Sequence, residues 1–174
     1  GNNFSPFATL SRNQDDKTWN LRAFGNIFAD FEIIEGLSLR SSLGMDMNTS
    51  RRRDIGRPQP EYVEGNFINS SSASNAYSYQ WVWTNTLDYS TTFNNVHNLR
   101  ANVGIEAIEQ FAEFFTASRQ RFAFETNEII SYLDLGDQTT SANGGNVSTD
   151  YSLFSQFGQF QYSYDDKYLA QFTL

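Results

Sequence analysis

The side chains that could carry out acid, base or nucleophilic chemistry are few in this sequence. His97 is the only histidine among 174 residues, and there is no cysteine. His97 precedes Asn98 in a turn-like stretch, where a side chain that bonds its own backbone is common. A single turn histidine without cysteines favours neither a Ser-His-Asp triad nor a zinc site. We therefore expect no catalytic residue, no metal site, no cofactor and no enzyme activity.

Carboxylates are more numerous, but they follow no catalytic spacing. Asp165 and Asp166 are adjacent in a stretch that reads as a turn, so they are expected to be solvated. Asp134 and Asp137 lie close together in "LDLGDQ". Oxygen ligands of this kind suit calcium, which needs several converging oxygens. We expect a solvated loop here in preference to a calcium-binding one.

The elements that would position these side chains are predicted by a period of two. In "LSLRSSLGMDMN" (residues 37–48) apolar side chains or serine take the odd positions and mostly polar ones the even positions. Alternation of this kind is typical of a β-strand with one apolar and one polar face. The same pattern occurs at 19–31, 77–90 and 98–107, and more weakly at 151–164 and 168–174.

Composition agrees with an all-β chain. Sixteen Phe, nine Tyr and three Trp occur in a chain that is only 39% hydrophobic, and aromatic residues favour strands. The net charge of −8 argues against a nucleic-acid partner, because phosphate binding needs an excess of Lys and Arg. The triplet Arg51-Arg52-Arg53 is interpreted as a solvated loop patch. No apolar run is long enough for a transmembrane helix.

The connections between the expected strands alternate between long and short. Short connections are expected at 32–36, 91–97 and 165–167, and long ones before 18, at 49–76 and at 108–150. Within the long ones, "NSSSASN" and "TTSANGGNVS" read as flexible loop tips. Outer-membrane barrels have short periplasmic turns and long extracellular loops, whereas a soluble sandwich has no reason for this alternation.

Aromatic residues on the apolar face support a membrane setting. With strands oriented by their loops, these residues fall at strand ends, as in the two aromatic girdles of a bilayer-spanning barrel. The apolar face would then contact outer-membrane lipid. The outer set is Trp19, Tyr77, Tyr79, Trp81 and Trp83, and the inner set is Phe31, Tyr89, Tyr162, Tyr164 and Tyr168.

The polar face would border an aqueous lumen. Its side chains could contact a plug domain or passing substrate, or they could form a wall network of mutually paired charges. The predicted lumen-lining residues are Arg22, Asp30, Arg40, Asp46, Gln80, Arg100 and Glu106. Six strands cannot close around such a lumen, so we expect an antiparallel transmembrane β-barrel segment, with residues 1–174 as part of a single barrel domain.

One stretch is ambiguous between strand and helix. In "IEAIEQFAEFF" (105–115) Ile105, Ile108, Ala112 and Phe115 have helical spacing, with good helix formers between them. The alternation that precedes this stretch favours a strand. We expect a strand to about Ala107 and allow a short helix after it.

Four segments of the amino-acid sequence resemble a known protein family. The segments "AFGNIFADFEIIEGLSLRSSLGMD", "YSYQWVWTNTLDYSTTFNNVHNLRANVGIEAI", "YLDLG" and "SLFSQFGQFQYSYDDKYLAQFTL" resemble, in order and spacing, the middle of the barrel in the SusC/RagA family of TonB-dependent outer-membrane transporters of Bacteroidetes. The resemblance covers nearly the whole chain outside 49–76 and 137–149. Gln156 and Gln159 depart from it, since the family often has an aromatic and a basic residue there.

The resemblance implies properties that the residues alone do not give. It implies a barrel of roughly 22 strands in the outer membrane of a Gram-negative bacterium, with a plug domain and a TonB box upstream of this chain. It also implies a SusD-like surface lipoprotein as partner, and energy from the TonB complex through the N-terminal part. The expected cargo is a large nutrient, a glycan more than a peptide.

Two alternatives remain open from the sequence. A soluble β-sandwich, such as a carbohydrate-binding module, would bury Trp19, Leu21 and Ile27 beneath a second sheet. A passive porin or an adhesin barrel would share the strands but would lack the plug.

Overall fold

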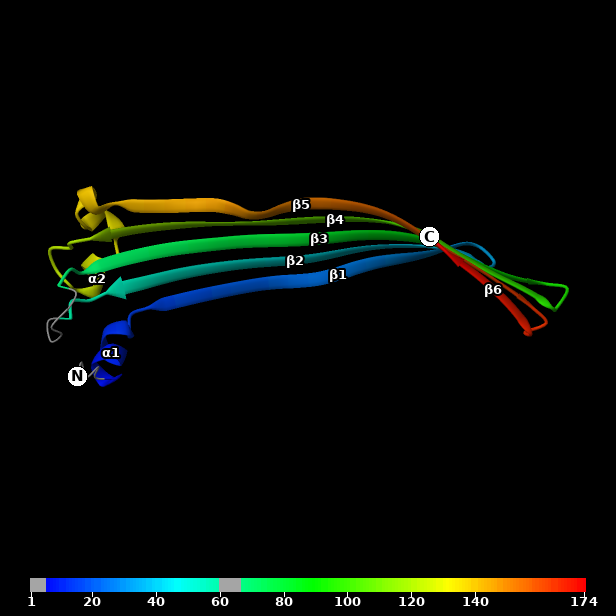
Figure 1. The fold of residues 1–174 in the computed structure, drawn as a ribbon, viewed down its shortest axis with the longest axis horizontal. Helices are drawn as coiled ribbons and strands as arrows, with labels where there is room; N and C mark the ends of the chain where they lie inside the picture. The colour runs from blue at the N-terminus through cyan, green and yellow to red at the C-terminus, as the bar shows by residue number, and fades with distance from the viewer. Residues whose placement is uncertain (1–5, 60–66) are drawn as a thin grey trace. The chain divides into compact units, whose positions relative to one another are not determined.

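The computed structural model describes residues 6–59 and 67–174. In these ranges it contains one six-stranded sheet with strand order β1-β2-β3-β4-β5-β6, each strand beside the next in sequence (Figure 1). This up-and-down order is the topology of a β-barrel wall. The strands are β1 Lys17–Ile34, β2 Leu37–Gly56, β3 Ser70–Phe93, β4 His97–Gln120, β5 Ala142–Tyr164 and β6 Tyr168–Thr173.

Helical structure is limited to short elements. These are α1 Pro6–Asn13, α2 Asn127–Ile130 and the 3-10 turns η1 Leu133–Leu135 and η2 Gln138–Thr140. No helix in the described ranges is long and apolar enough to cross a membrane. All six expected strands are present, so the all-β prediction is confirmed.

The strands extend beyond their predicted ends. The strand expected to about Ala107 is present, but no short helix follows it, because β4 continues to Gln120 between two neighbours. Phe111 stacks on Tyr79 of β3 with ring centroids 5.7 Å apart, and Gln110 accepts a 2.9 Å hydrogen bond from Tyr151 of β5. Backbone pairing on both sides therefore overrides helix propensity.

Two predictions about presumed loops are wrong. Arg51, Arg52 and Arg53 belong to β2 and not to a solvated loop. The Arg51 guanidinium lies 5.8 Å from the ring centre of Trp19, and Arg52 Nε donates to Asp54 at 2.8 Å. The serine-rich stretch 69–75 is also structured, since β3 begins at Ser70, and β5 begins at Ala142 inside the second presumed loop tip.

The chain divides into two compact units. Unit 1 comprises Gly1–Arg22, Asn48–Ser78 and Ala112–Thr149, and unit 2 comprises Ala23–Met47, Tyr79–Phe111 and Asp150–Leu174. Unit 1 holds the helices and the long connections, whereas unit 2 holds the three short turns.

The short turns of unit 2 are built from residues that tolerate positive φ. The β3–β4 turn has Asn94 and Asn95 at φ 52° and 60°, and the β5–β6 turn has Asp165 and Asp166 at 47° and 51°. Asn and Asp adopt this left-handed conformation more readily than other side chains do. The β1–β2 turn uses Gly36 at φ +80°. The β3–β4 turn and the β5–β6 turn are each closed by two consecutive left-handed residues. The two strands that each turn joins therefore run antiparallel.

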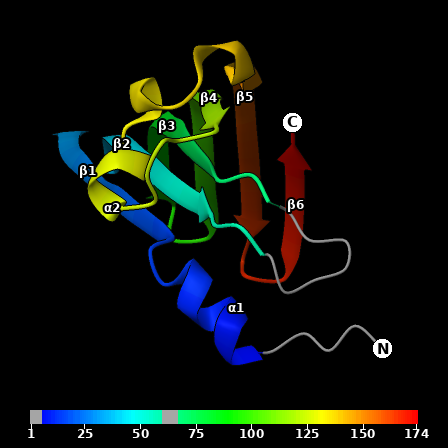
Figure 2. The ribbon, with the colours of Figure 1, turned by 90° about the vertical axis from the view of Figure 1, so that its left-hand side faces the viewer.

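All buried residues of the described ranges belong to unit 1. They are Ile55, Asn69, Ser71, Phe122 and Ile130. In Figure 2 the short helices and turns of unit 1 lie at the strand ends. In unit 2, Ile27 is 72% exposed and Val103 is 53% exposed. A soluble sandwich would bury such side chains beneath a second sheet, and the described ranges form one sheet only.

Candidate functional site

The polar face of unit 2 is held by contacts that cross from strand to strand. Arg40 of β2 binds Asp30 of β1 through two parallel bonds, Nε to Oδ1 at 2.6 Å and Nη2 to Oδ2 at 2.9 Å. Thr84 of β3 donates to Glu106 of β4 at 3.1 Å. All four positions are even-numbered. On β1 to β4 the even positions therefore share a polar face, as the period of two predicted.

Further contacts on this face lie nearer to the short turns. Asn102 Nδ2 donates to Asp88 Oδ1 at 2.5 Å, and the Thr92 hydroxyl donates to Asn98 Oδ1 at 2.7 Å. None of these four residues was among the predicted lumen-lining residues. Their even parity was the signal that could have identified them.

The predicted lumen-lining residues are partly brought together. Asp30 pairs with Arg40, and Glu106 binds Thr84, which agrees with a network of paired side chains. Gln80 is half-buried in β3, and Arg100 is exposed near the start of β4. Arg22 and Asp46 also have interaction partners, and Arg22 belongs to unit 1. That these side chains line a lumen stays a prediction.

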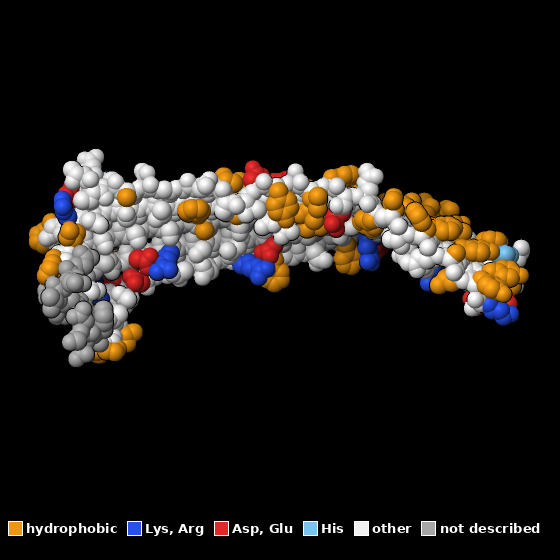
Figure 3. All heavy atoms as spheres, in the orientation of Figure 1, with side chains coloured by type: hydrophobic (Ala, Val, Ile, Leu, Met, Phe, Trp, Pro, Cys, Tyr) orange, Lys and Arg blue, Asp and Glu red, His pale blue; other side chains and the backbone are white. Residues whose placement is uncertain are grey.

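On β1 to β4, the odd-numbered face of unit 2 is apolar. Ile27, Phe31, Leu43 and Val103 are all among its exposed large hydrophobic residues. One polar contact on this face is the 3.1 Å hydrogen bond that Trp83 Nε1 donates to Ser41. In Figure 3 hydrophobic side chains stand on the surface of the strands, with acidic and basic side chains close together at several points.

An aromatic cluster surrounds the one histidine. His97 stacks on Phe93 with centroids 4.7 Å apart and an interplanar angle of 7°. Its Nδ1 lies 2.7 Å from the Tyr162 hydroxyl, and its ring centre lies 5.1 Å from that of Tyr164. Tyr164 in turn stacks on Tyr168 at 6.5 Å. His97 thus bonds a tyrosine instead of its own backbone, and the cluster gathers three residues predicted for the inner aromatic girdle.

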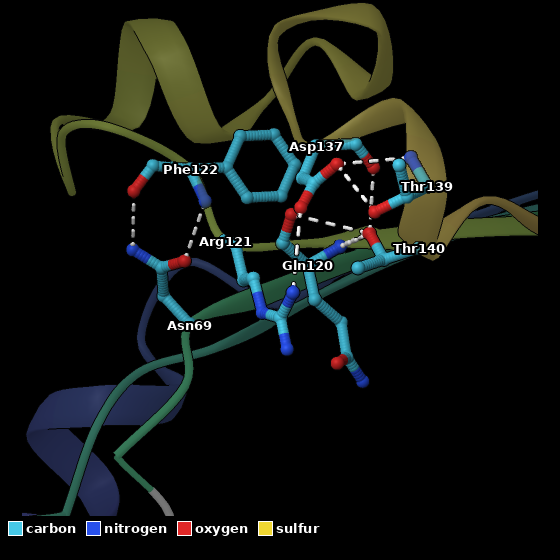
Figure 4. A network of polar contacts seen from close by, with 7 residues as sticks. All are labelled: Asn69, Gln120, Arg121, Phe122, Asp137, Thr139 and Thr140. Atoms are coloured by element: carbon cyan, nitrogen blue, oxygen red, sulfur yellow. Dashed lines mark hydrogen bonds and ion pairs between the residues drawn. The ribbon is translucent and has the colours of Figure 1, made fainter.

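In unit 1 the long segment after β4 is fastened to the start of β3 by one asparagine. Asn69 Nδ2 donates to the Phe122 carbonyl at 3.0 Å, and Asn69 Oδ1 accepts from the Phe122 N–H at 2.7 Å (Figure 4). The Arg121 N–H donates to the Asn69 carbonyl at 3.0 Å. Asn69 is 8% exposed and Phe122 is 5% exposed. The Asn69 side-chain amide therefore bonds both the N–H and the carbonyl of buried Phe122, as a neighbouring strand would do in a sheet.

Asp137 organises the η2 turn beside this contact. Its Oδ1 accepts from the Thr139 N–H at 2.9 Å and from the Thr139 hydroxyl at 2.7 Å, and Arg121 Nη1 lies 3.5 Å from its Oδ2 (Figure 4). The Thr139 hydroxyl, the Thr139 N–H and the Arg121 guanidinium hold the pKa of Asp137 below its ordinary value. Asp137 is thus a turn residue, while Asp134 is exposed in η1. Within the described ranges no three His, Cys, Asp or Glu side chains could hold a metal.

Another set of contacts joins the α1–β1 connection to the end of β2. The Ile55 N–H donates to Asp16 Oδ1 at 2.8 Å, and Arg57 Nη2 lies 2.5 Å from Asp15 Oδ2. Arg57 Nη1 also donates to the Glu125 carbonyl at 3.1 Å. The described part of unit 1 is therefore an ordered cap on the strand ends.

The fold and its two faces define a segment of an antiparallel β-barrel, polar on one side and apolar on the other. The search against protein-family models gave no match. The chain is 27% identical over 173 residues to TonB-dependent receptor P3 of Formosa agariphila, and 25% identical over 170 residues to TonB-dependent receptor P26 of the same organism. Both relatives are TonB-dependent receptors, which supports the resemblance to TonB-dependent transporters of the SusC/RagA type that the sequence segments indicated.

Solved structures give the same fold. The chain matches the structure of the RagAB peptide transporter with a TM-score of 0.83 and 23% identity over 95% of its length. It also matches the RagAB peptide importer in the closed-closed state with a TM-score of 0.78 over 92% of its length. The curated relatives are named receptors and these solved neighbours a transporter and an importer, which together support the prediction that the chain is not an enzyme.

The matched region is a small part of each relative. The match to receptor P3 covers 97% of this chain but only 16% of the receptor. The match to the RagAB structure covers 18% of the RagAB chain. The activity, cargo and partners of a whole protein of this type are therefore matters of proposal.

Proposed function

We propose that residues 1–174 form part of the wall of one barrel domain in the outer membrane of a Gram-negative bacterium, and that the whole protein imports large nutrients. The observation that carries this proposal is the division of β1 to β4 in unit 2 into two faces. Even positions are cross-linked by polar contacts such as Asp30–Arg40, and odd positions such as Ile27 and Val103 expose apolar side chains. Such a sheet suits lipid on one side and water on the other.

The lumen-lining residues of the proposal are those predicted from the sequence. Arg22, Asp30, Arg40, Asp46, Gln80, Arg100 and Glu106 would border the aqueous interior. Import would proceed by movement of a plug domain, with energy supplied through TonB. A SusD-like lipoprotein would bind the outer face. The names of the relatives and the matches to RagAB support this scheme.

The proposed cargo is an oligosaccharide. The polar face of unit 2 is rich in amides and hydroxyls, including Asn26, Ser42, Thr84 and Asn102, and its Asp30–Arg40 pair is internally neutralised. Such a face offers hydrogen bonds without a net charge, which suits a neutral polyhydroxylated chain. Peptide is the second candidate, because the solved neighbours are named a peptide transporter and importer.

An accessibility experiment tests the two faces. In a cysteine-free version of the whole protein, single cysteines replace Asn26, Ile27, Asn102 or Val103, and intact outer membranes are treated with a charged maleimide. Positions 26 and 102 should be modified, whereas 27 and 103 should be protected by lipid. Equal modification of all four positions would contradict the barrel wall.

An uptake experiment tests import. Cells that express the whole protein are supplied with fluorescent oligosaccharides or peptides, with and without a protonophore. Uptake that depends on the protein and stops when the membrane potential collapses supports TonB-driven import. Uptake that persists without energy would indicate a passive porin instead.

A further inference from the structure

The polar face of β1 in unit 2 carries aromatic rings that a membrane setting does not explain. Its even positions alternate ring and polar group, as Phe24, Asn26, Phe28 and Asp30. Phe24 is 75% exposed and Phe28 is 64% exposed. Rings on the odd face would gain from lipid, but rings on the polar face would not. An exposed ring between polar groups instead resembles a surface that binds a ligand with both apolar and hydroxyl parts.

Phe28 is held in a fixed setting by its neighbours. The Arg40 guanidinium lies 5.2 Å from the centre of the Phe28 ring, and the same guanidinium is bonded to Asp30 through two atoms. The cation therefore covers one side of the ring and fixes its orientation. Because the Phe28 ring and the Arg40 guanidinium are already held in place, they lose little conformational entropy when a ligand binds.

The group also has unused hydrogen-bonding capacity. A guanidinium has five N–H donors, and Asp30 accepts from two of them, one on Nε and one on Nη2. The side chains of Arg40 and Asp30 remain 57% and 47% exposed. The guanidinium donors, the carboxylate lone pairs and the Asn26 amide can thus serve adjacent hydroxyl groups. The charges of Arg40 and Asp30 cancel, which favours a neutral ligand over a charged one.

We propose that Phe24, Asn26, Phe28, Asp30 and Arg40 form a subsite for a neutral oligosaccharide, which we call the β1 strip. This assignment rests on the proposed function and names the residues that would contact its cargo. The C–H face of a sugar ring stacks on Phe24 or Phe28, while its hydroxyl groups bond the polar side chains between and beside the rings.

The spacing of the two rings adds a length requirement. Phe24 and Phe28 are four residues apart on one face of a strand, which corresponds to about 13 Å. This distance exceeds the length of one sugar ring. A single sugar can therefore use one ring only, whereas an oligosaccharide can use both. Binding should strengthen with chain length up to the span of the strip.

Calorimetry on the full-length protein in detergent tests the β1 strip. The probes are maltohexaose, laminarihexaose, xylohexaose and mannohexaose, each with its disaccharide. We expect at least one hexaose to bind more tightly than its disaccharide. Phe28→Ala should weaken that binding about tenfold, as for a residue at the centre of an interface, and Phe24→Ala should act in the same direction.

Two further variants make the result specific. Phe28→Leu keeps an apolar side chain of similar reach but removes the aromatic face, so it should also weaken binding. Phe31→Ala removes an aromatic ring of the same strand on the opposite face, where Phe31 is 56% exposed, and should leave binding unchanged. Faster migration of unheated protein on a gel confirms that each variant is a folded barrel.

The outcomes separate this proposal from the proposed function. A hexaose that binds wild type and all variants equally would overturn the β1 strip and leave oligosaccharide import intact. Failure of the protein to bind any of the four hexaoses would also overturn it. The cell uptake experiment then shows whether oligosaccharide import fails as well.

Discussion

Phe157 of β5 lies over Gly104 of β4, in the space that a side chain at position 104 would occupy. A Cβ at Gly104 would overlap the Phe157 ring atoms Cζ and Cε2 and would lie 3.0 Å from the Asn85 carbonyl oxygen. An aromatic ring over a strand glycine shields the exposed backbone and fixes the pairing of neighbouring strands. The glycine and the phenylalanine thus act as one packing unit between β4 and β5.

Gly104→Ala should therefore destabilise the barrel. The ring can rotate away, but the Asn85 carbonyl belongs to the backbone of β3 and cannot. Overpacking of this kind costs about 1–3 kcal/mol. Unfolding of the whole protein in urea with lipid vesicles measures the effect. Gly25→Ala is the matched control, because a Cβ at Gly25 would meet nothing within 4 Å. Equal stability of the two variants would contradict the packing unit.

The strands were predictable where one face differs chemically from the other. Around Ile27, Leu43 and Val103 the alternation of apolar and polar residues is strong, and the structure has strands at each of these positions. In contrast, β3 begins at Ser70 and β4 continues to Gln120. There the side chains on both faces are polar or mixed, so backbone hydrogen bonds extend the strands without leaving a periodic signal.

The sequence predicted which residues lie on the polar face, but it did not predict which of them bond to each other. Even parity identified Asp30, Arg40 and Glu106, yet the sequence alone could not give the pairing of Glu106 with Thr84. Partner choice depends on strand register, which a period of two leaves free to shift by two residues. Asn69 was read as part of a flexible loop, because a side chain that binds the backbone of residue 122 leaves no local pattern.

Asn69 should be essential for order in the segment that follows β4. Asn69→Ala removes both bonds to the Phe122 backbone and leaves a buried N–H and carbonyl without those partners. An unsatisfied buried group costs about 1–3 kcal/mol. Hydrogen exchange of the whole protein should become faster at amides of residues 120–141. Exchange at the β5–β6 turn should not change, and faster exchange there as well would indicate global unfolding instead of a local effect.

The η2 turn should lose stability in acid. The folded-state pKa of Asp137 is lowered, first by the Thr139 hydroxyl and then by the Thr139 N–H and Arg121. A lowered folded pKa means that the carboxylate stabilises the turn at pH values above the ordinary Asp pKa of 3.8, and that this contribution is lost as pH falls through the folded value. Pepsin cleavage near residues 137–141 should therefore rise steeply below about pH 3.8.

Asp137→Asn is the control for that pH dependence. The amide can still accept a bond from Thr139, but it carries no charge for Arg121 and does not titrate. The variant should be cleaved at a rate that changes less with pH than wild type. A wild-type cleavage rate that is flat between pH 5 and pH 2 would show that Asp137 does not stabilise the turn.

Neighbouring positions of β2 offer a direct measure of the solvent on each face. Ser42 has the polar parity and Leu43 the apolar parity, with Leu43 42% exposed. Leu43→Lys would place a charge in lipid, which costs about 2–4 kcal/mol at the middle of a bilayer, whereas Ser42→Lys would place it in water at little cost. Urea unfolding of the whole protein in vesicles gives both values. A similar loss of stability for the two variants would mean that the faces do not meet different solvents, and it would remove the physical basis for a barrel wall in this chain.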